Sequence, residues 1–354
     1  MKGPRGGELE TGAGERFTRV GEIRLCYESF GERGAPPVVL VMGLGSQMVL
    51  WDDDFCRGLA DRGFFVTRFD NRDAGRSTIL RHLPVPTRAQ VILRDPRAAA
   101  YSLVDMAADA AGLIERLELG AVHLVGASMG AMIAQLVAIH HPERVRSLVL
   151  IMSTTGGHRV GRAQPRMYAR LLRRPRRGRE GYIEDFVETH RALGSRRYPG
   201  DERRLRARAA RCFARGYHPA GTARQLQAVV TAPDRTAALG RLRMPVTVIH
   251  GGADPLVSPS GGHATAAAIP GARLLILPDM GHDLPPELWP QILDAIVENA
   301  HAANGGPRLG SLSRAARPPA PLGRRGRASE LRGGDLGAVG ERSQLEPGDA
   351  RIDQ

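Results

Sequence analysis

Short apolar runs alternate with helix-like segments along most of the 354-residue chain, and this rhythm constrains its fold more than any other feature. The runs are continuously apolar, as in strands that are buried on both faces of a parallel sheet. A strand pair is predicted across 15–30, and further strands at 38–42, 64–69, 121–125, 145–152, 246–250 and 274–277. Helices are predicted at 51–60, 102–117, 129–140, 258–269 and 284–300. This alternation indicates βαβ units, so we predict an α/β fold with a mostly parallel central sheet flanked by helices.

The strand and helix rhythm stops in the middle of the chain and later resumes. Residues 156–243 contain helical stretches but no buried-strand run, and the rhythm returns at Pro245. We therefore predict a core made of 15–155 and 244–301, with 156–243 inserted as an arginine-rich helical cap. The end segments, 1–14 and 302–354, are rich in Gly and charged residues and poor in apolar ones. They are predicted to be a flexible N-terminus and a disordered tail.

Positive charge is concentrated in the predicted cap. The chain has a formal net charge of +13, and residues 156–243 alone hold 22 arginines against 7 acidic residues. Nine of these arginines lie within 159–179, which could bind the phosphates of a nucleic acid or another anionic surface. Tyr168 is the only aromatic residue there, so the segment offers no stacking platform and nucleic-acid binding is disfavoured. A solvated helical face explains the same charge.

Cysteine usage and hydropathy exclude several classes of protein. Cys26, Cys56 and Cys212 are odd in number and widely spaced, so neither a disulfide framework nor a metal site is indicated. No apolar stretch approaches the ~20 residues that cross a bilayer, and we predict no membrane span. Residues 1–14 have no apolar core of a signal peptide. A cytoplasmic location is therefore expected.

A candidate nucleophile lies between a predicted strand and a predicted helix. Residues 126–130, Gly-Ala-Ser-Met-Gly, match the pattern G-x-S-x-G. In such an elbow the serine sits on a sharp turn that lifts its hydroxyl to the carboxyl edge of the sheet. The glycines are needed because side chains there would collide with the neighbouring strand and helix. We predict Ser128 as a nucleophile.

A serine hydroxyl is a weak nucleophile, so a base must remove its proton and a third group must orient that base. After such an elbow the acid and then the histidine follow in chain order. His282 lies in a loop directly after the last predicted strand, at the same sheet edge as Ser128. Asp254 is the first carboxylate after the strand at 246–250. We predict His282 as base and Asp254 as acid, with Asp279 as the alternative acid.

Acyl transfer also requires donors for the oxyanion that forms on the carbonyl oxygen. One donor is expected to be the backbone N–H of Met129, the residue after the nucleophile. The other is expected from the loop after the strand at 38–42, where Leu44 lies between Gly43 and Gly45. We therefore predict Leu44 and Met129 as the oxyanion hole.

Several blocks of this sequence resemble bacterial α/β-hydrolases of the aclacinomycin methylesterase type. The blocks are Val-Met-Gly-Leu-Gly-Ser at 41–46 with Trp51, Phe-Asp-Asn-Arg-Asp-Ala-Gly-Arg-Ser at 69–77, the elbow, Gly-Ala-Asp-Pro at 252–255 and Met-Gly-His at 280–282. The resemblance covers about residues 15–300 and implies the α/β-hydrolase fold and carboxylic ester hydrolysis without a metal or organic cofactor. The charged residues of block 69–77 are expected to form a structural ion-pair network: Asp70, Arg72, Asp73 and Arg76. No histidine precedes Gly43, where many esterases have His-Gly.

The leading hypothesis is a serine hydrolase that cleaves a small or medium hydrophobic carboxylic ester through an acyl-enzyme. The same triad could instead support cofactor-free perhydrolysis with peroxide or C–C bond hydrolysis. Epoxide hydrolase and dehalogenase activities are disfavoured because those relatives need an aspartate where Ser128 stands. A protein that binds nucleic acid or an anionic surface through 159–179 is the alternative of a different class.

Overall fold

The computed structural model describes residues 14–305, and eight strands of this part form one sheet. In chain order they are β1 (Arg16–Val20), β2 (Ile23–Phe30), β3 (Pro37–Val41), β4 (Phe65–Phe69), β5 (Val122–Ala127), β6 (Val145–Ile151), β7 (Val246–Gly251) and β8 (Arg273–Leu277). Across the sheet the order is β1-β2-β4-β3-β5-β6-β7-β8. The pairs β1–β2 and β2–β4 are antiparallel, and the remaining pairs are parallel. The predicted mostly parallel sheet is thus confirmed.

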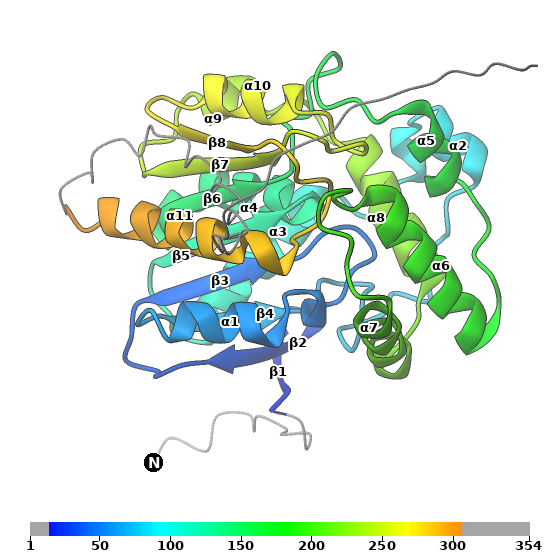
Figure 1. Ribbon diagram of the computed structural model, residues 1–354, viewed down its shortest axis with the longest axis horizontal. Coiled ribbons are helices and arrows are strands. Elements are labelled where there is room, and N and C mark those ends of the chain that lie inside the picture. The colour runs from blue at the N-terminus through cyan, green and yellow to red at the C-terminus, as the bar shows by residue number, and fades with distance from the viewer. Residues whose placement is uncertain (1–13, 306–354) are drawn as a thin grey trace, which may run out of the picture. The chain divides into compact units, whose positions relative to one another are not determined.

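Helices cover both faces of the sheet (Figure 1). α3 (Leu103–Arg116) and α4 (Met129–His140) share one apolar cluster with the sheet, and α1 (Asp53–Ala60) and α11 (Trp289–Ala302) share another. The central strand β5 is buried along its whole length. This two-sided burial explains why the strands appear in the sequence as continuous apolar runs. Two further helices, α2 (Arg88–Ile92) and α10 (Ser260–Ala268), lie outside the insertion, and the short α9 (Thr236–Leu239) is the last helix before β7.

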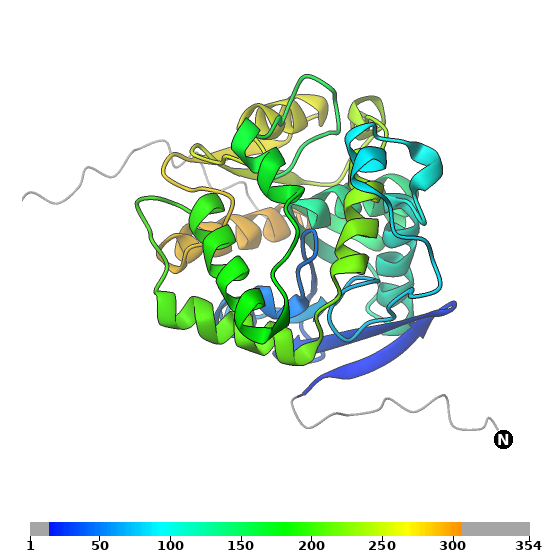
Figure 2. The same cartoon turned by 90° about the vertical axis from the view of Figure 1, so that its right-hand side faces the viewer.

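The helices between β6 and β7 form the insertion that the sequence predicts as a cap. They are α5 (Pro165–Leu171), α6 (Gly178–Leu193), α7 (Glu202–Arg215) and α8 (Pro219–Val230), followed by α9. Figure 1 shows α5 to α8 together on the right of the sheet, and Figure 2 looks onto that side. Leu239 of α9 instead packs into the core cluster that contains α3 and α4.

Buried ion pairs attach the inserted helices to the core. Arg215 of α7 contacts Asp70 at 2.8 Å, and Arg224 of α8 contacts Asp73 at 2.7 Å. The other two charged residues of block 69–77 also find partners outside it, as Arg72 pairs with Asp109 and Arg76 with Glu15. The block therefore forms ion pairs, as expected, but with α3, α7, α8 and the segment before β1.

Some element boundaries differ from the predicted ones. The helix expected from residue 51 begins at Asp53, because the Asp52 side chain accepts a hydrogen bond from the Asp54 N–H and caps it. The helix expected from residue 284 begins at Trp289, after the two prolines 285 and 286 and a short 3₁₀ turn. Most of the predicted flexible end segments, 1–14 and 302–354, lies outside the described residues. Within residues 14–305, no helix has the length and apolarity to span a bilayer.

Candidate active site

Ser128 stands on a strained turn between β5 and α4. Its backbone has φ 56° and ψ −120°, a left-handed conformation that is rare for a residue with a side chain. The glycines on either side allow this turn. A Cβ on Gly126 would lie 2.4 Å from the Gly130 carbonyl oxygen, and one on Gly130 would lie 2.1 Å from that of Val41. The sequence therefore has glycine where the elbow packs against its own helix and against β3.

The structure brings the three predicted side chains of the triad into one hydrogen-bonded chain. His282 Nε2 lies 2.9 Å from Ser128 Oγ, and His282 Nδ1 lies 2.7 Å from Asp254 Oδ2. The second oxygen of Asp254 accepts hydrogen bonds from the N–H groups of Leu256 at 2.8 Å and Val257 at 2.9 Å. These bonds fix the buried carboxylate, so that Oδ2 faces the histidine. In this geometry His282 can take a proton from Ser128 while the carboxylate orients the ring.

A second histidine, His250 at the end of β7, lies beside the candidate acid Asp254. It is fully buried, and its Nε2 donates a hydrogen bond to the Val257 carbonyl oxygen at 2.8 Å. The same nitrogen lies 3.6 Å from Asp254 Oδ2. Burial lowers the pKa of His250, which favours a neutral ring beside the carboxylate. A buried histidine thus lies in contact with the candidate acid.

Asp279, the alternative acid, and two histidines of the inserted segment, His190 and His218, have partners outside the triad. Asp279 is exposed and pairs with Arg197 at 3.3 Å. His190 contacts the Phe186 carbonyl oxygen at 2.9 Å, and His218 contacts that of Gly75 at 3.1 Å.

The loop after β3 passes directly beside Ser128. A Cβ on Gly43 would lie 3.2 Å from the Cβ of Ser128, and Leu44, Ser128 and Met129 line one pocket. The backbone N–H groups of Leu44 and Met129 donate no hydrogen bond to another side chain or loop of residues 14–305. Both groups predicted as oxyanion donors therefore remain available to a bound molecule.

Helix α8 holds this loop in place. Gln225 is fully buried, its Oε1 accepts a hydrogen bond from the Gly45 N–H at 2.8 Å, and its Nε2 donates to the Arg72 carbonyl oxygen at 2.7 Å. Thr222 packs against Gly45, where a Cβ would approach it to 2.7 Å. Gly45 has φ 63°, so it combines a left-handed backbone with this close approach. Sequence reasoning missed Gln225, because nothing in the pattern of the inserted segment connects it to residue 45.

The end of α6 and the residues after it hold the loop of His282 through hydrogen bonds. The His282 N–H donates to the Leu193 carbonyl oxygen at 2.8 Å, and the Gly281 N–H donates to Ser195 Oγ at 2.8 Å. Ser195 Oγ in turn donates to Asp283 Oδ1 at 2.6 Å. Burial raises the pKa of Asp283, against the lowering effect of the Ser195 hydrogen bonds. The base is thus tied on both sides to the chain between α6 and α7.

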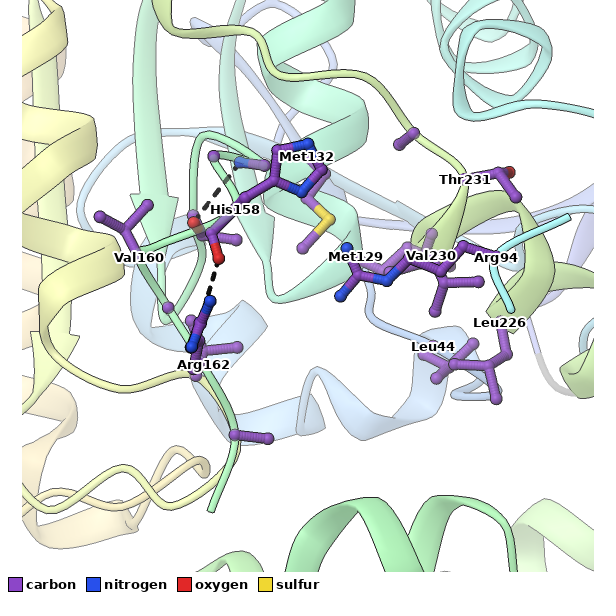
Figure 3. Close-up of a pocket in the computed structure, with 18 of the residues that line it drawn as sticks. Leu44, Arg94, Met129, Met132, His158, Val160, Arg162, Leu226, Val230 and Thr231 are labelled. Atoms are coloured by element: carbon purple, nitrogen blue, oxygen red, sulfur yellow. Dashed lines mark hydrogen bonds between the residues drawn. The ribbon is translucent and has the colours of Figure 1, made fainter. Parts of the chain in front are cut away.

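A pocket of about 930 Å³ opens above Ser128 (Figure 3). Its wall combines residues of the core with residues of the insertion, and most of them are apolar: Leu44, Met129, Met132, Val160, Leu171, Leu226, Val229, Val230, Leu256 and Val257. Arg94, at the end of α2, points its guanidinium into this space in Figure 3, and Arg162 lies on the opposite wall. Such a volume and lining suit an apolar molecule of drug size. The role of Arg94 in the pocket was not predicted from the sequence.

The cysteines are poor candidates for nucleophiles, and metal-ligating side chains are not clustered within residues 14–305. All three cysteines are buried. Burial raises the pKa of Cys56 to about 12 and that of Cys212 to about 11, so their reactive thiolate forms are disfavoured. In the described part of the chain, no group of three or more His, Cys, Asp or Glu side chains could hold a metal ion.

Comparison with known proteins agrees with this architecture. The family model for the alpha/beta hydrolase fold matches residues 36–287, which is most of the chain. The chain belongs to the α/β-hydrolase family. This confirms the family resemblance drawn from the sequence blocks, and it makes the protein a hydrolase of the α/β fold.

Three proteins illustrate the range of similar α/β hydrolases. DauP, a rhodomycin D methylesterase of Streptomyces sp. (strain C5), is 29% identical over 311 residues, covering 81% of this chain and 98% of DauP. The 2-hydroxy-6-oxononadienedioate/2-hydroxy-6-oxononatrienedioate hydrolase 2 of Pseudomonas putida is 27% identical over 281 residues, covering 78% and 92%. The crystal structure of the enol-lactonase from Burkholderia xenovorans LB400 aligns with a TM-score of 0.64 at 24% identity, covering 80% and 99%. At this level of identity, the similarity to the enol-lactonase shows a shared fold alone.

Proposed function

We propose that this α/β hydrolase is a serine esterase, with Ser128 as nucleophile, His282 as general base and Asp254 as the group that orients His282. The single observation that carries the proposal is the continuous hydrogen-bonded chain from Ser128 through His282 to Asp254, with contacts of 2.9 and 2.7 Å. It is supported by the strained elbow, which presents the hydroxyl at the carboxyl edge of the sheet.

In the first half of the reaction, Ser128 Oγ attacks the ester carbonyl carbon while His282 Nε2 takes the hydroxyl proton. The carbonyl oxygen becomes an oxyanion, which accepts hydrogen bonds from the N–H groups of Leu44 and Met129. The C–O bond to the alcohol then breaks, and His282 returns its proton to the leaving oxygen. The acyl group remains on Ser128.

In the second half, water replaces the alcohol. His282 takes a proton from this water, which attacks the acyl carbon, and the second oxyanion forms in the same place as the first. Breakdown returns the proton to Ser128 Oγ and releases the carboxylic acid. Asp254 orients the His282 ring in both halves, because the N–H groups of Leu256 and Val257 hold one of its oxygens and the other faces His282 Nδ1.

The substrate class proposed is a hydrophobic carboxylic ester with a small alcohol part. The rhodomycin D methylesterase relative supports a methyl ester. The 930 Å³ pocket and its mostly apolar lining support an apolar acyl part that fills the space between β5, α8 and the loop 156–163.

Hydrolysis of methyl and p-nitrophenyl esters of graded acyl length tests the proposal. We expect kcat/KM to rise with apolar acyl size, and Ser128→Ala to lower kcat by about 10⁶-fold because the triad acts as a unit. Normal turnover by the folded Ser128→Ala variant would refute the proposed role of Ser128.

A second activity with the same triad is C–C bond hydrolysis, which the Pseudomonas putida relative favours, since its name describes a 2-hydroxy-6-oxo dienedioate hydrolase. Perhydrolysis with peroxide is the other reaction of this triad that was predicted from the sequence. Rates on an ester, on a vinylogous diketone and with peroxide plus bromide distinguish the three reactions. The ester is expected to give the highest kcat/KM.

A further inference from the structure

Two short helices at the opening of the pocket carry strongly exposed apolar side chains. At the end of α2, Ile92 is 62% exposed and Leu93 is 77% exposed, more than any other large apolar residue of 14–305. On α5, Tyr168 is 46% exposed and Leu171 is 38% exposed. Figure 1 places α2 and α5 on the same side of the sheet, and Figure 2, which looks onto that side, shows α2 to the right of α5 in the upper part of the view. We call these four residues the pocket rim.

The pocket rim is continuous with the pocket itself. Tyr168 and Leu171 belong both to the rim and to the pocket wall, and Arg94 of the wall directly follows Leu93. A molecule that contacts the rim therefore has a direct path to Ser128, which lines the same pocket. Exposed apolar residues gathered at a site opening mark a surface that meets another apolar phase or partner.

Positive charge surrounds these apolar residues. The segment 159–179, which contains α5, has nine arginines and no acidic residue. Some of its arginines pair with Glu188 and Asp185 of α6. Seven exposed arginines of this segment and of the α2 region form no ion pair with a carboxylate of the described chain: Arg88, Arg94, Arg159, Arg162, Arg166, Arg174 and Arg177. Their charge is available to an external anion.

The combination of exposed aliphatic residues and unpaired arginines fits a lipid surface better than a nucleic acid. Leucine and isoleucine side chains insert among acyl chains, while arginines contact anionic headgroups. Single-stranded nucleic acids bind through aromatic stacking platforms, and the rim offers one aromatic ring, Tyr168. Each basic residue near an anionic membrane surface strengthens binding by a factor of about five.

We propose that the pocket rim and its arginines form a docking surface for an anionic lipid bilayer, from which amphiphilic ester substrates enter the pocket. The second half of this statement rests on the proposed esterase function, and the first half does not. Docking would place the opening between α2 and α5 against the bilayer and keep the substrate's apolar part out of water during transfer. In this arrangement the arginines of 159–179 contact anionic lipid headgroups, a role that ester hydrolysis by itself does not require.

Vesicle flotation with the full chain measures the docking directly. The probes are vesicles of pure phosphatidylcholine and vesicles with about one third phosphatidylglycerol. We expect binding to the anionic vesicles at low salt, loss of binding toward about 0.5 M NaCl, and weak binding to pure phosphatidylcholine. The pair Arg166→Gln and Arg174→Gln should lower the partition constant about 25-fold, and the pair Ile92→Asn and Leu93→Asn about tenfold or more.

Matched variants separate the rim from general charge and general hydrophobicity. Arg33→Gln with Arg241→Gln removes two exposed arginines away from the rim, and Val104→Asn removes an apolar side chain that is 43% exposed on α3. These controls should leave the partition constant nearly unchanged. Ile92 and Leu93 do not line the pocket. Their double variant should therefore keep its kcat/KM on a water-soluble short-chain ester and lose rate on a long-chain ester presented in the anionic vesicles.

Two results would overturn the docking surface. One is absence of flotation with anionic vesicles by folded protein at low salt. The other is tight binding to single-stranded RNA that depends on Arg166 and Arg174 but not on Ile92 and Leu93, which would assign the arginines to nucleic-acid phosphates. Flotation is read without any ester, so failure of the esterase proposal would appear separately, as a protein that binds vesicles but hydrolyses no ester.

Discussion

Gln225 accepts a hydrogen bond from the backbone N–H of Gly45 at 2.8 Å, across 180 residues of sequence. Gly45 follows Leu44, the proposed oxyanion donor, and Gln225 lies on α8 of the inserted segment. The same amide donates to the Arg72 carbonyl oxygen, so the loop after β3 and the loop after β4 are joined through one side chain. Helix α8 therefore positions a part of the proposed catalytic machinery, in addition to lining the pocket.

Replacing Gln225 by alanine should lower kcat by about 10- to 100-fold, because the Leu44 N–H would no longer be held at the position of the oxyanion. KM for a short ester should change little, since Gln225 itself does not line the pocket. Steady-state kinetics on one soluble ester measure both effects.

Gln227→Ala is the matched control for this variant. Gln227 is also buried on α8 and donates to the Asp95 carbonyl oxygen at 2.6 Å, away from the loop of Leu44. Both variants should lose about 1–3 kcal/mol of unfolding free energy through an unpaired buried partner. An equal loss of kcat in both would show that Gln225 acts only on stability.

Asp254→Asn should lower kcat by about 10⁴-fold with little change in the fold, because an asparagine amide favours the wrong tautomer of His282. Asp279→Asn is the control, as Asp279 lies three residues before His282 but is exposed and pairs with Arg197. It should retain nearly full activity. The reverse order of the two effects would assign the acid to Asp279.

Stability should fall as the pH is lowered from about 6.5 toward 4, because burial lowers the pKa of His123 to about 4. In the unfolded chain a histidine titrates near 6.5, so within this window the unfolded state binds a proton that the folded state does not. His123 alone should remove up to about 1.4 kcal/mol per pH unit from the unfolding free energy.

Urea unfolding at pH 7, 6 and 5 measures this slope. The slope should be shallower in His123→Gln, in which the titrating ring is gone, and unchanged in His82→Gln, which replaces an exposed ring. Parallel slopes for wild type and His123→Gln would contradict the assignment.

Removal of the Asp73 carboxylate by Asp73→Ala should cost about 3–5 kcal/mol, because it leaves Arg224 as an unpaired buried cation. The pair is bidentate, with contacts of 2.7 and 2.8 Å, and both side chains are buried. Asp54→Ala breaks exposed pairs with Arg57 and Arg204 and should cost about 1 kcal/mol or less. Chemical denaturation of the two variants tests the difference, and similar values would argue against α8 being anchored through Asp73.

The alternation of apolar runs predicted the sheet, because strands buried on both faces leave a local signal in the sequence. Ser128, Asp254 and His282 could be selected for a related reason, since each directly follows a predicted strand and the carboxyl ends of parallel strands meet at one edge. Gln225, Ser195 and Arg94 could not be selected in this way. Their roles depend on how the inserted segment and α2 pack over that edge, and periodicity shows which face of a helix is buried without showing which loop it covers.

The central claim is that Ser128 is a nucleophile activated by His282. Its most direct test is labelling of the folded protein with a fluorophosphonate probe, followed by mass-spectrometric mapping of the adduct. We expect an adduct on Ser128 that is absent in Ser128→Ala and is lost in His282→Ala. An adduct on another residue, or no adduct on folded protein that binds the probe in its pocket, would contradict it.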